Sequence, residues 1–182
     1  QVIWEESEQL GGVNLAGGSL DLKLGGFTAG GANPSRWNAG TLTGTGPAAQ
    51  VLGGTSGIEK TGPETVTVSG NASIAVTGGL AIAEGMILHD AAANLGTSDV
   101  LLGGDFTAGT FGYAGATASR GGSFSLNAGG GGFEVTGPTA TLTLTGPVTG
   151  AGSLTKTGPG TLAILADNQA TGSVVVAGGT LA

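Results

Sequence analysis

LTKTGPGTLAI, at residues 154–164, decides the fold of this chain, because its pattern occurs once more as IEKTGPETVTV at residues 58–68. The two segments align without a gap, and their first residues are 96 positions apart. In each copy, apolar residues alternate with small polar residues on both sides of a Thr-Gly-Pro turn. Alternation with a period of two predicts short strands that bury one face and expose the other. The repeat therefore predicts strand, corner and strand rather than helix.

Corner chemistry recurs outside these two segments. Thr-Gly-Pro occurs five times, at 45–47, 61–63, 136–138, 145–147 and 157–159. Gly tolerates a positive φ, and Pro has a fixed φ and no N–H, so the pair fits a corner better than the middle of a ladder. The repeat-corner residues are Lys60, Gly62, Pro63, Lys156, Gly158, Pro159, Gly178 and Gly179. We expect successive coils of a solenoid to turn the same corner against each other.

Composition narrows the fold class to all-β. The chain has 40 Gly among 182 residues and only 9% charged residues, yet 39% are hydrophobic, so it has apolar side chains to bury. A β-sandwich or barrel could contain such short strands, but a repeated corner sequence favours a solenoid. With about 20–25 residues per coil, the chain would form roughly seven to nine coils.

Several function classes are excluded. Glycine does not recur at every third position, as collagen requires, and the chain has no Cys for disulfides or thiolate metal sites. No apolar stretch approaches the roughly 20 residues of a membrane-spanning helix. The net charge is −7, and the basic residues are scattered, which argues against nucleic acid as a partner. The five basic residues are Lys23, Arg36, Lys60, Arg120 and Lys156.

A family resemblance rests on residues 150–182, which read GAGSLTKTGPGTL (150–162), then Asn168, Gly172 and VVVAGGTL (174–181). This stretch resembles the passenger-associated transport repeat of bacterial autotransporters, the proteins of type V secretion. Residues 57–81 look like a second, degraded copy, with Glu64 in the place of Gly160. The repeat brings no catalytic residues and no cofactor.

The resemblance implies a right-handed parallel β-helix that is exported through the outer membrane to the cell surface. Its partners would include its own C-terminal outer-membrane β-barrel, whose sequence is absent from this chain. We therefore interpret residues 1–182 as a single β-helical fragment of a longer passenger.

Catalytic or metal-binding chemistry finds little support. His89 is the sole histidine and lies beside Asp90, but no Gly-x-Ser-x-Gly motif supplies a nucleophile. Asp99 with Asp105, or Glu59 with Glu64, could form the carboxylate pair of a glycosidase if neighbouring coils brought them together. Sparse carboxylates are more simply solvated surface charges, and we predict no catalytic, cofactor or metal site.

A binding surface is the remaining possibility. Residues 27–50 and 106–120 are the longest stretches without clear strands, and solenoid insertions often form the binding face. The candidate residues are Arg36, Trp37, Asn38, Tyr113 and Arg120. Exposed Trp or Tyr could stack on sugar rings, although core packing is the simpler interpretation of Trp37.

Three functions remain open. The leading hypothesis is a non-catalytic surface passenger in adhesion or cell–cell aggregation, with a host-cell or matrix ligand, a glycan or another passenger as partner. The second is a structural or autochaperone stalk that supports secretion and folding, while the effector activity lies elsewhere. The third is a polysaccharide-active β-helix enzyme.

Overall fold

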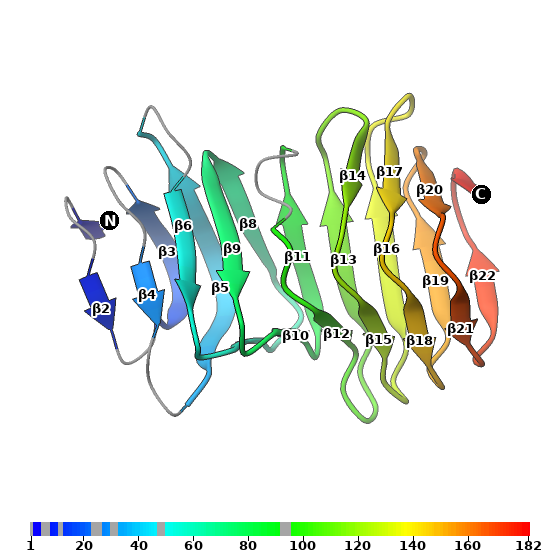
Figure 1. Cartoon of the computed structure of the whole chain (residues 1–182), viewed down its shortest axis with the longest axis horizontal. Helices are drawn as coiled ribbons and strands as arrows, with labels where there is room; N and C mark the ends of the chain where they lie inside the picture. Colours follow the sequence, from blue (N-terminus) through cyan, green and yellow to red (C-terminus); the bar gives the residue numbers. More distant parts are fainter. Residues whose placement is uncertain are drawn as a thin grey trace.

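Short strands stack along one long axis in the computed structural model of the chain, with the two termini at opposite ends (Figure 1). The structure describes residues 2–4, 8–10, 13–22, 27–29, 33–46, 50–91 and 96–182, and for 2–4, 8–10 and 27–29 the backbone alone. Every pairing between described strands is parallel. The described residues include no helix. The prediction of an all-β, parallel β-solenoid is thus confirmed.

Each coil passes through three faces, and a strand on one face pairs with its equivalents in the coils before and after it. Two long strands, β3 (Leu15–Leu22) and β5 (Ser35–Gly44), run through the first and the second face. The first face continues with β7 (Ile58–Lys60), β10 (Leu80–Ile82), β12 (Val100–Leu102), β15 (Phe124–Leu126), β18 (Val148–Gly150) and β21 (Asn168–Ala170).

The second face lies beside the first along the whole axis (Figure 1). Besides β3 and β5, it contains β1 (Val2–Trp4), β8 (Thr65–Gly70), β11 (Gly85–His89), β13 (Gly109–Tyr113), β16 (Gly131–Val135), β19 (Leu154–Thr157) and β22 (Val174–Val176). Equivalent residues in neighbouring coils are 18 positions apart for Val2 and Leu20, and 26 apart for Leu42 and Val68. The coil length therefore varies along the chain.

The third face is divided into two ladders. One consists of β2 (Glu8–Leu10), β4 (Phe27–Ala29), β6 (Gln50–Gly54) and β9 (Ala72–Val76). The other consists of β14 (Ala118–Arg120), β17 (Thr141–Leu144), β20 (Thr161–Ile164) and β23 (Thr180–Leu181). Among the described residues, the coil that holds β10 and β11 adds no strand to this face.

The expectation that residues 27–50 and 106–120 lack clear strands is wrong. The first stretch holds β4 and β5, and the second holds β13 and β14. β5 crosses the bend between two faces without interruption, and Gly40 within it has a φ of 130°. Glycine thus bends a continuous strand here, whereas the sequence suggested a break.

The core is a set of inward-facing columns, one side chain per coil. Val66, Ile87, Phe111 and Phe133 follow one another on the second face, and all four are fully buried. Beside this column, the first residues of three strands are glycines, Gly85, Gly109 and Gly131, which pair in register. Backbone atoms of neighbouring residues fill the space where a side chain would lie at Gly85 and Gly109, and the Leu102 and Leu126 side chains fill it at Gly131.

Candidate functional site

Three of the five predicted binding-surface residues are inside the solenoid. Trp37 and Tyr113 have no exposed surface and Arg120 is 2% exposed, so the prediction that they contact a ligand is wrong. Arg36 and Asn38 are exposed on the first face. A side-chain oxygen of Asn38 accepts a hydrogen bond from the Thr61 hydroxyl at 2.8 Å.

The buried members have a common role at the corners. Where the chain turns between faces, the strand ladder is interrupted and carbonyls lack strand partners, yet buried carbonyls need donors. The Trp37 ring N–H donates to the Val13 carbonyl at 2.9 Å, and the Tyr113 hydroxyl donates to the Ala116 carbonyl at 2.6 Å. Each of these long, buried side chains therefore uses its polar end to donate a hydrogen bond to a backbone carbonyl.

Arg120 does the same at the corner between the third and the first face. Its guanidinium donates to the Gly121 carbonyl at 2.7 Å and to the Ser98 carbonyl of the preceding coil. It lies 4.7 Å from the ring centroid of Phe124 and 5.2 Å from that of Phe111, within cation–π range. Burial lowers the pKa of Arg120 to about 10, and the Asp99 carboxylate opposes this shift.

Lys60 is buried at the corner between the first and the second face. Its ammonium donates to the carbonyls of Thr61 at 3.0 Å, Gly62 at 2.6 Å and, in the next coil, Glu84 at 3.1 Å. Burial lowers the pKa of Lys60, and the carboxylates of Glu84 and Glu64 oppose this shift.

Lys156 repeats this arrangement at a different corner. It is fully buried, and its ammonium donates to the carbonyls of Thr157 at 2.5 Å, Gly158 at 3.0 Å and, in the next coil, Gly178 at 3.2 Å. Burial lowers the pKa of Lys156, and the Glu134 carboxylate opposes the shift.

The expectation that the two repeat copies turn the same corner is wrong. Residues 60–63 connect the first face to the second, whereas 156–159 connect the second to the third. The local geometry is nevertheless shared, because Gly62 has a φ of 77° and Gly158 a φ of 74°. Of the other repeat-corner residues, Pro63, Pro159 and Gly179 are exposed or half-buried, and Gly178 supplies the carbonyl that Lys156 binds.

Sequence reasoning missed the interior role of these cations, although a signal was present. Lys60 follows buried Ile58 by two positions, and Lys156 follows buried Leu154 by two. Period-two alternation therefore placed both lysines on the inner face. Lys23, another basic residue, lies outside the described residues.

Two of the residues considered for catalysis, His89 and Glu59, have structural contacts. His89 is fully buried, and its ring stacks on Phe111 with 4.6 Å between centroids. Glu59 forms an ion pair with Arg36 at 3.6 Å. The described residues contain no group of three or more His, Asp or Glu side chains placed to hold a metal ion.

Asp99 joins two coils on the outer surface. One of its carboxylate oxygens accepts hydrogen bonds from the Ser123 N–H at 2.9 Å and from the Ser123 hydroxyl at 2.7 Å. These two bonds lower the pKa of Asp99 most strongly, and Arg120 adds to this effect.

Replacement of Asp99 by Asn tests this link between coils. A folded-state pKa below the unfolded value of 3.8 means that the carboxylate stabilises the fold above that pH and loses its effect as the pH falls through the folded pKa. We expect Asp99→Asn to lower the midpoint of thermal unfolding near neutral pH and to leave it unchanged at about pH 2. An equal difference at both pH values would contradict the ionic contribution.

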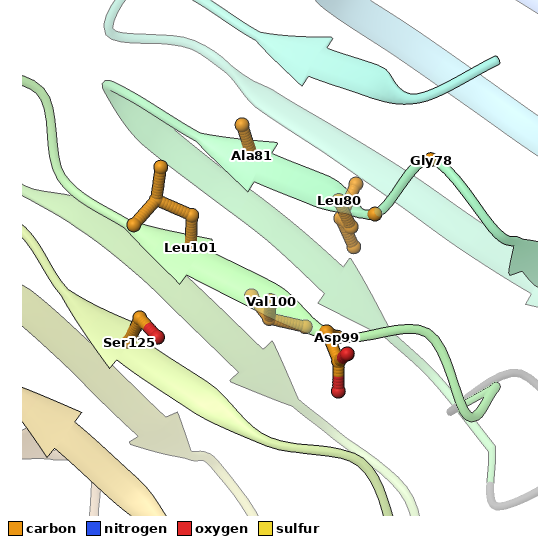
Figure 2. Close-up of a pocket in the computed structure, with 8 residues that line it drawn as sticks. Gly78, Leu80, Ala81, Asp99, Val100, Leu101 and Ser125 are labelled. Atoms are coloured by element: carbon orange, nitrogen blue, oxygen red, sulfur yellow. The ribbon is translucent and has the colours of Figure 1, made fainter.

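Two depressions lie on the outer surface that the described residues form. Figure 2 shows one of about 240 Å³ on the first face, where Ala81, Leu101 and Ser125 point outward from neighbouring strands and Asp99 lies at its end. A second, of about 190 Å³, lies on the second face where Gly132 leaves a gap between Thr110 and Thr155.

Phe106 is the most exposed large apolar side chain among the described residues, at 97%. The loop that carries it connects β12 to β13 and is held at its base. The Thr107 hydroxyl donates to the Ala83 carbonyl at 2.7 Å, and the Gly104 N–H lies 2.8 Å from the Thr107 carbonyl. The loop thus presents an aromatic ring to solvent from a fixed base.

Comparison with known proteins gives two matches. The family model of the passenger-associated transport repeat matches residues 154–182. The adhesin BmaC autotransporter of Brucella suis biovar 1 (strain 1330) is 40% identical over 73 residues, which cover 40% of this chain and 2% of that protein. The chain thus corresponds to a very small part of this relative. No solved structure matches the chain.

The structure adds to these matches. Residues 154–182 form the β19, β20, β21, β22 and β23 strands, and Lys156 and Gly158 within them form a buried corner. No helix in the described part of the chain is long and apolar enough to cross a membrane. The status of residues 57–81 as a second copy of the repeat stays a prediction. The repeat match, the similarity to an autotransporter adhesin over 73 residues and the parallel β-solenoid together support an autotransporter passenger domain.

Proposed function

We propose that this β-solenoid acts in adhesion or cell–cell aggregation at the bacterial surface, without catalysis. The passenger family implies export to the cell surface, and the relative with 40% identity over 73 residues is named an adhesin. The observation that carries the proposal is the outer surface of the solenoid, which repeats polar side chains in register from coil to coil.

Hydroxyl groups form ladders on all three faces. Thr141, Thr161 and Thr180 pair in register on the third face. The Thr43 hydroxyl lies 3.1 Å from that of Ser69 on the second face, in hydrogen-bonding contact. Neighbouring strands in a sheet are about 4.8 Å apart, so such ladders present donors and acceptors at a regular spacing. Many weak contacts of this kind suit a glycan, a matrix or host-cell ligand, or the equivalent face of another passenger.

A purely structural stalk is the second candidate, because the most specific sequence features point inward. Lys60 and Lys156 donate hydrogen bonds to corner carbonyls and are fully buried, so neither side chain is accessible to a partner. In this alternative, the segment would support secretion and folding, and the effector activity would lie elsewhere.

An assay with coated beads separates these two functions. The purified chain, shown to be folded by far-UV circular dichroism, is coupled to beads that are mixed with each other and with host cells. Clumping of the beads indicates self-association, and attachment to cells indicates a host ligand. If that ligand is a sugar, soluble glycans should compete with it and reduce attachment. Beads that carry an unrelated protein of similar net charge serve as the control. If the chain is folded but the beads neither clump nor attach to cells, the result would favour the structural stalk.

Phe106 provides a point mutation for the same assay. A fixed, exposed aromatic ring is the type of side chain that anchors protein interfaces. We expect Phe106→Ser to weaken adhesion or aggregation roughly tenfold, the effect of losing about 1.4 kcal/mol of binding free energy. Its unfolding free energy should stay within about 0.5 kcal/mol of the parent, since the side chain has no buried contacts to lose. Phe106→Leu is the matched control and should retain most of the activity. Wild-type adhesion by the serine variant would exclude Phe106 as an anchor.

A further inference from the structure

We propose that Lys60, Arg120 and Lys156 are interior locks that join consecutive coils, so that docking of one coil on the next completes the hydrogen bonding of a buried cation. Each cation binds carbonyls of its own corner and one carbonyl of an adjacent coil. The locks act on the stability of the coil stack, whether or not the outer surface binds a partner.

The number of donors matches the number of acceptors at both lysines. A protonated lysine has three N–H donors and no acceptor. Each ammonium lies within hydrogen-bonding distance of three carbonyls, two from the residues that follow it and one from the next coil. Without the next coil, one donor of each ammonium would have no protein partner in this set.

The locks occupy all three corners of the solenoid. Lys60 lies where the first face turns into the second, Lys156 where the second turns into the third, and Arg120 where the third turns into the first. The same type of contact thus recurs at three different corners, with two side-chain types. The corner carbonyls that these cations bind need hydrogen-bond donors, which an apolar side chain could not supply.

The lysine lock also accounts for the tetrapeptide Lys-Thr-Gly-Pro. Lys60 and Lys156 each face inward near the end of a strand, and the Gly two positions later takes a positive φ. This bend accompanies two successive carbonyls that both lie within reach of the ammonium. Pro then follows without an N–H that would need a partner. The motif therefore specifies a corner together with its link to the next coil.

Hydrogen exchange of the whole 182-residue chain tests the lock at Lys156. We expect Lys156→Met, which retains side-chain length but has no donor, to reduce amide protection in residues 174–181 at least tenfold. Residues 100–126, one to two coils away, should keep their protection. Lys156→Arg, which keeps the charge and the donors, should restore part of it. Arg36→Met, which removes an exposed cation, is the matched control and should change neither region.

Two results would overturn the proposal. One is unchanged protection of residues 174–181 in Lys156→Met; the other is an equal loss in residues 100–126, which would indicate a general packing defect. If the methionine variant does not fold, the wild-type chain provides an independent test by ¹⁵N NMR. Locked lysines should show side-chain ammonium signals that exchange slowly with water. Rapid exchange at both Lys60 and Lys156 would exclude the lock.

Discussion

Gly109→Ala is expected to be the most damaging single methyl addition in the centre of this solenoid, with a loss of more than about 4 kcal/mol in unfolding free energy. A Cβ on Gly109 would lie 1.7 Å from the Ile82 carbonyl oxygen and 2.9 Å from the Gly103 nitrogen. Both atoms belong to the backbone, so no side-chain rotation relieves the clash. Because Ile82 belongs to the preceding coil, which also holds Gly85, that coil would have to move away.

Gly121→Ala is the matched control for this experiment. Its Cβ would have one neighbour within 4 Å, the Thr145 hydroxyl at 3.8 Å, and Gly121 has no positive φ. We expect this variant to match the parent or gain up to about 1 kcal/mol, since alanine restricts the unfolded chain. Urea unfolding followed by far-UV circular dichroism gives both free energies. Equal midpoints for the two variants would show that the glycine column tolerates side chains.

Phe111→Ala is expected to cost about 3–5 kcal/mol, the usual range for removal of a buried phenyl ring. Phe111 is fully buried between the stacked ring of His89 and the edges of Phe124 and Phe133. Its loss would leave a cavity and would also remove one of the two aromatic rings beside the Arg120 guanidinium. The destabilisation should therefore include both packing and cation–π contributions.

Phe106→Ala is the natural comparison, because the residue type and the substitution are the same but Phe106 is 97% exposed. We expect its unfolding free energy to stay within about 0.5 kcal/mol of the parent. Thermal unfolding of the two variants side by side measures the difference between a core and a surface phenylalanine. A similar midpoint for both would mean that the Phe111 site repacks without a cavity.

The sequence was sufficient for the fold class and for many of the strands. Residues 65–68 and 161–164 alternate as expected, with Val66, Val68 and Leu162 buried. The solenoid followed from one repeated corner sequence, since a sandwich has no reason to repeat a corner, and its parallel strands followed from the resemblance to the passenger-associated transport repeat. Period-two alternation and Gly-Pro chemistry are local properties, which is why one sequence sufficed.

The position of each corner around the axis could not be predicted. The separation between equivalent residues ranges from 18 for Val2 and Leu20 to 26 for Leu42 and Val68. An offset of 96 residues between the repeat copies therefore does not correspond to a whole number of coils, and the second copy lies one face further on. The motif can occupy either corner because its lysine binds only carbonyls of its own corner and one carbonyl of the next coil.

The prediction that Trp37, Tyr113 and Arg120 lie on the surface was wrong for a related reason. Trp37, Tyr113 and Arg120 were chosen because they lie in stretches without a clear strand pattern, where a solenoid insertion could form a binding face. The parallel ladder instead places them in strands, with their polar ends at the corners where the backbone lacks partners. That need for interior donors arises from the three-dimensional winding of the chain, and a local pattern indicates at most which face a side chain occupies. Arg36 and Asn38 stay exposed, and their binding role stays a prediction.

The direction of the ladder hydrogen bonds gives the solenoid a particular mechanical behaviour. Strands of successive coils are hydrogen-bonded along the axis that joins the two termini (Figure 1). A force that pulls the two termini apart would thus break the hydrogen bonds between one pair of coils at a time, and not those of many coils at once. Each released coil of about 22 residues would lengthen the chain by roughly 70 Å, compared with about 5 Å that it occupies when stacked. A surface stalk built in this way would yield in steps under tension and could rewind coil by coil when the force is removed.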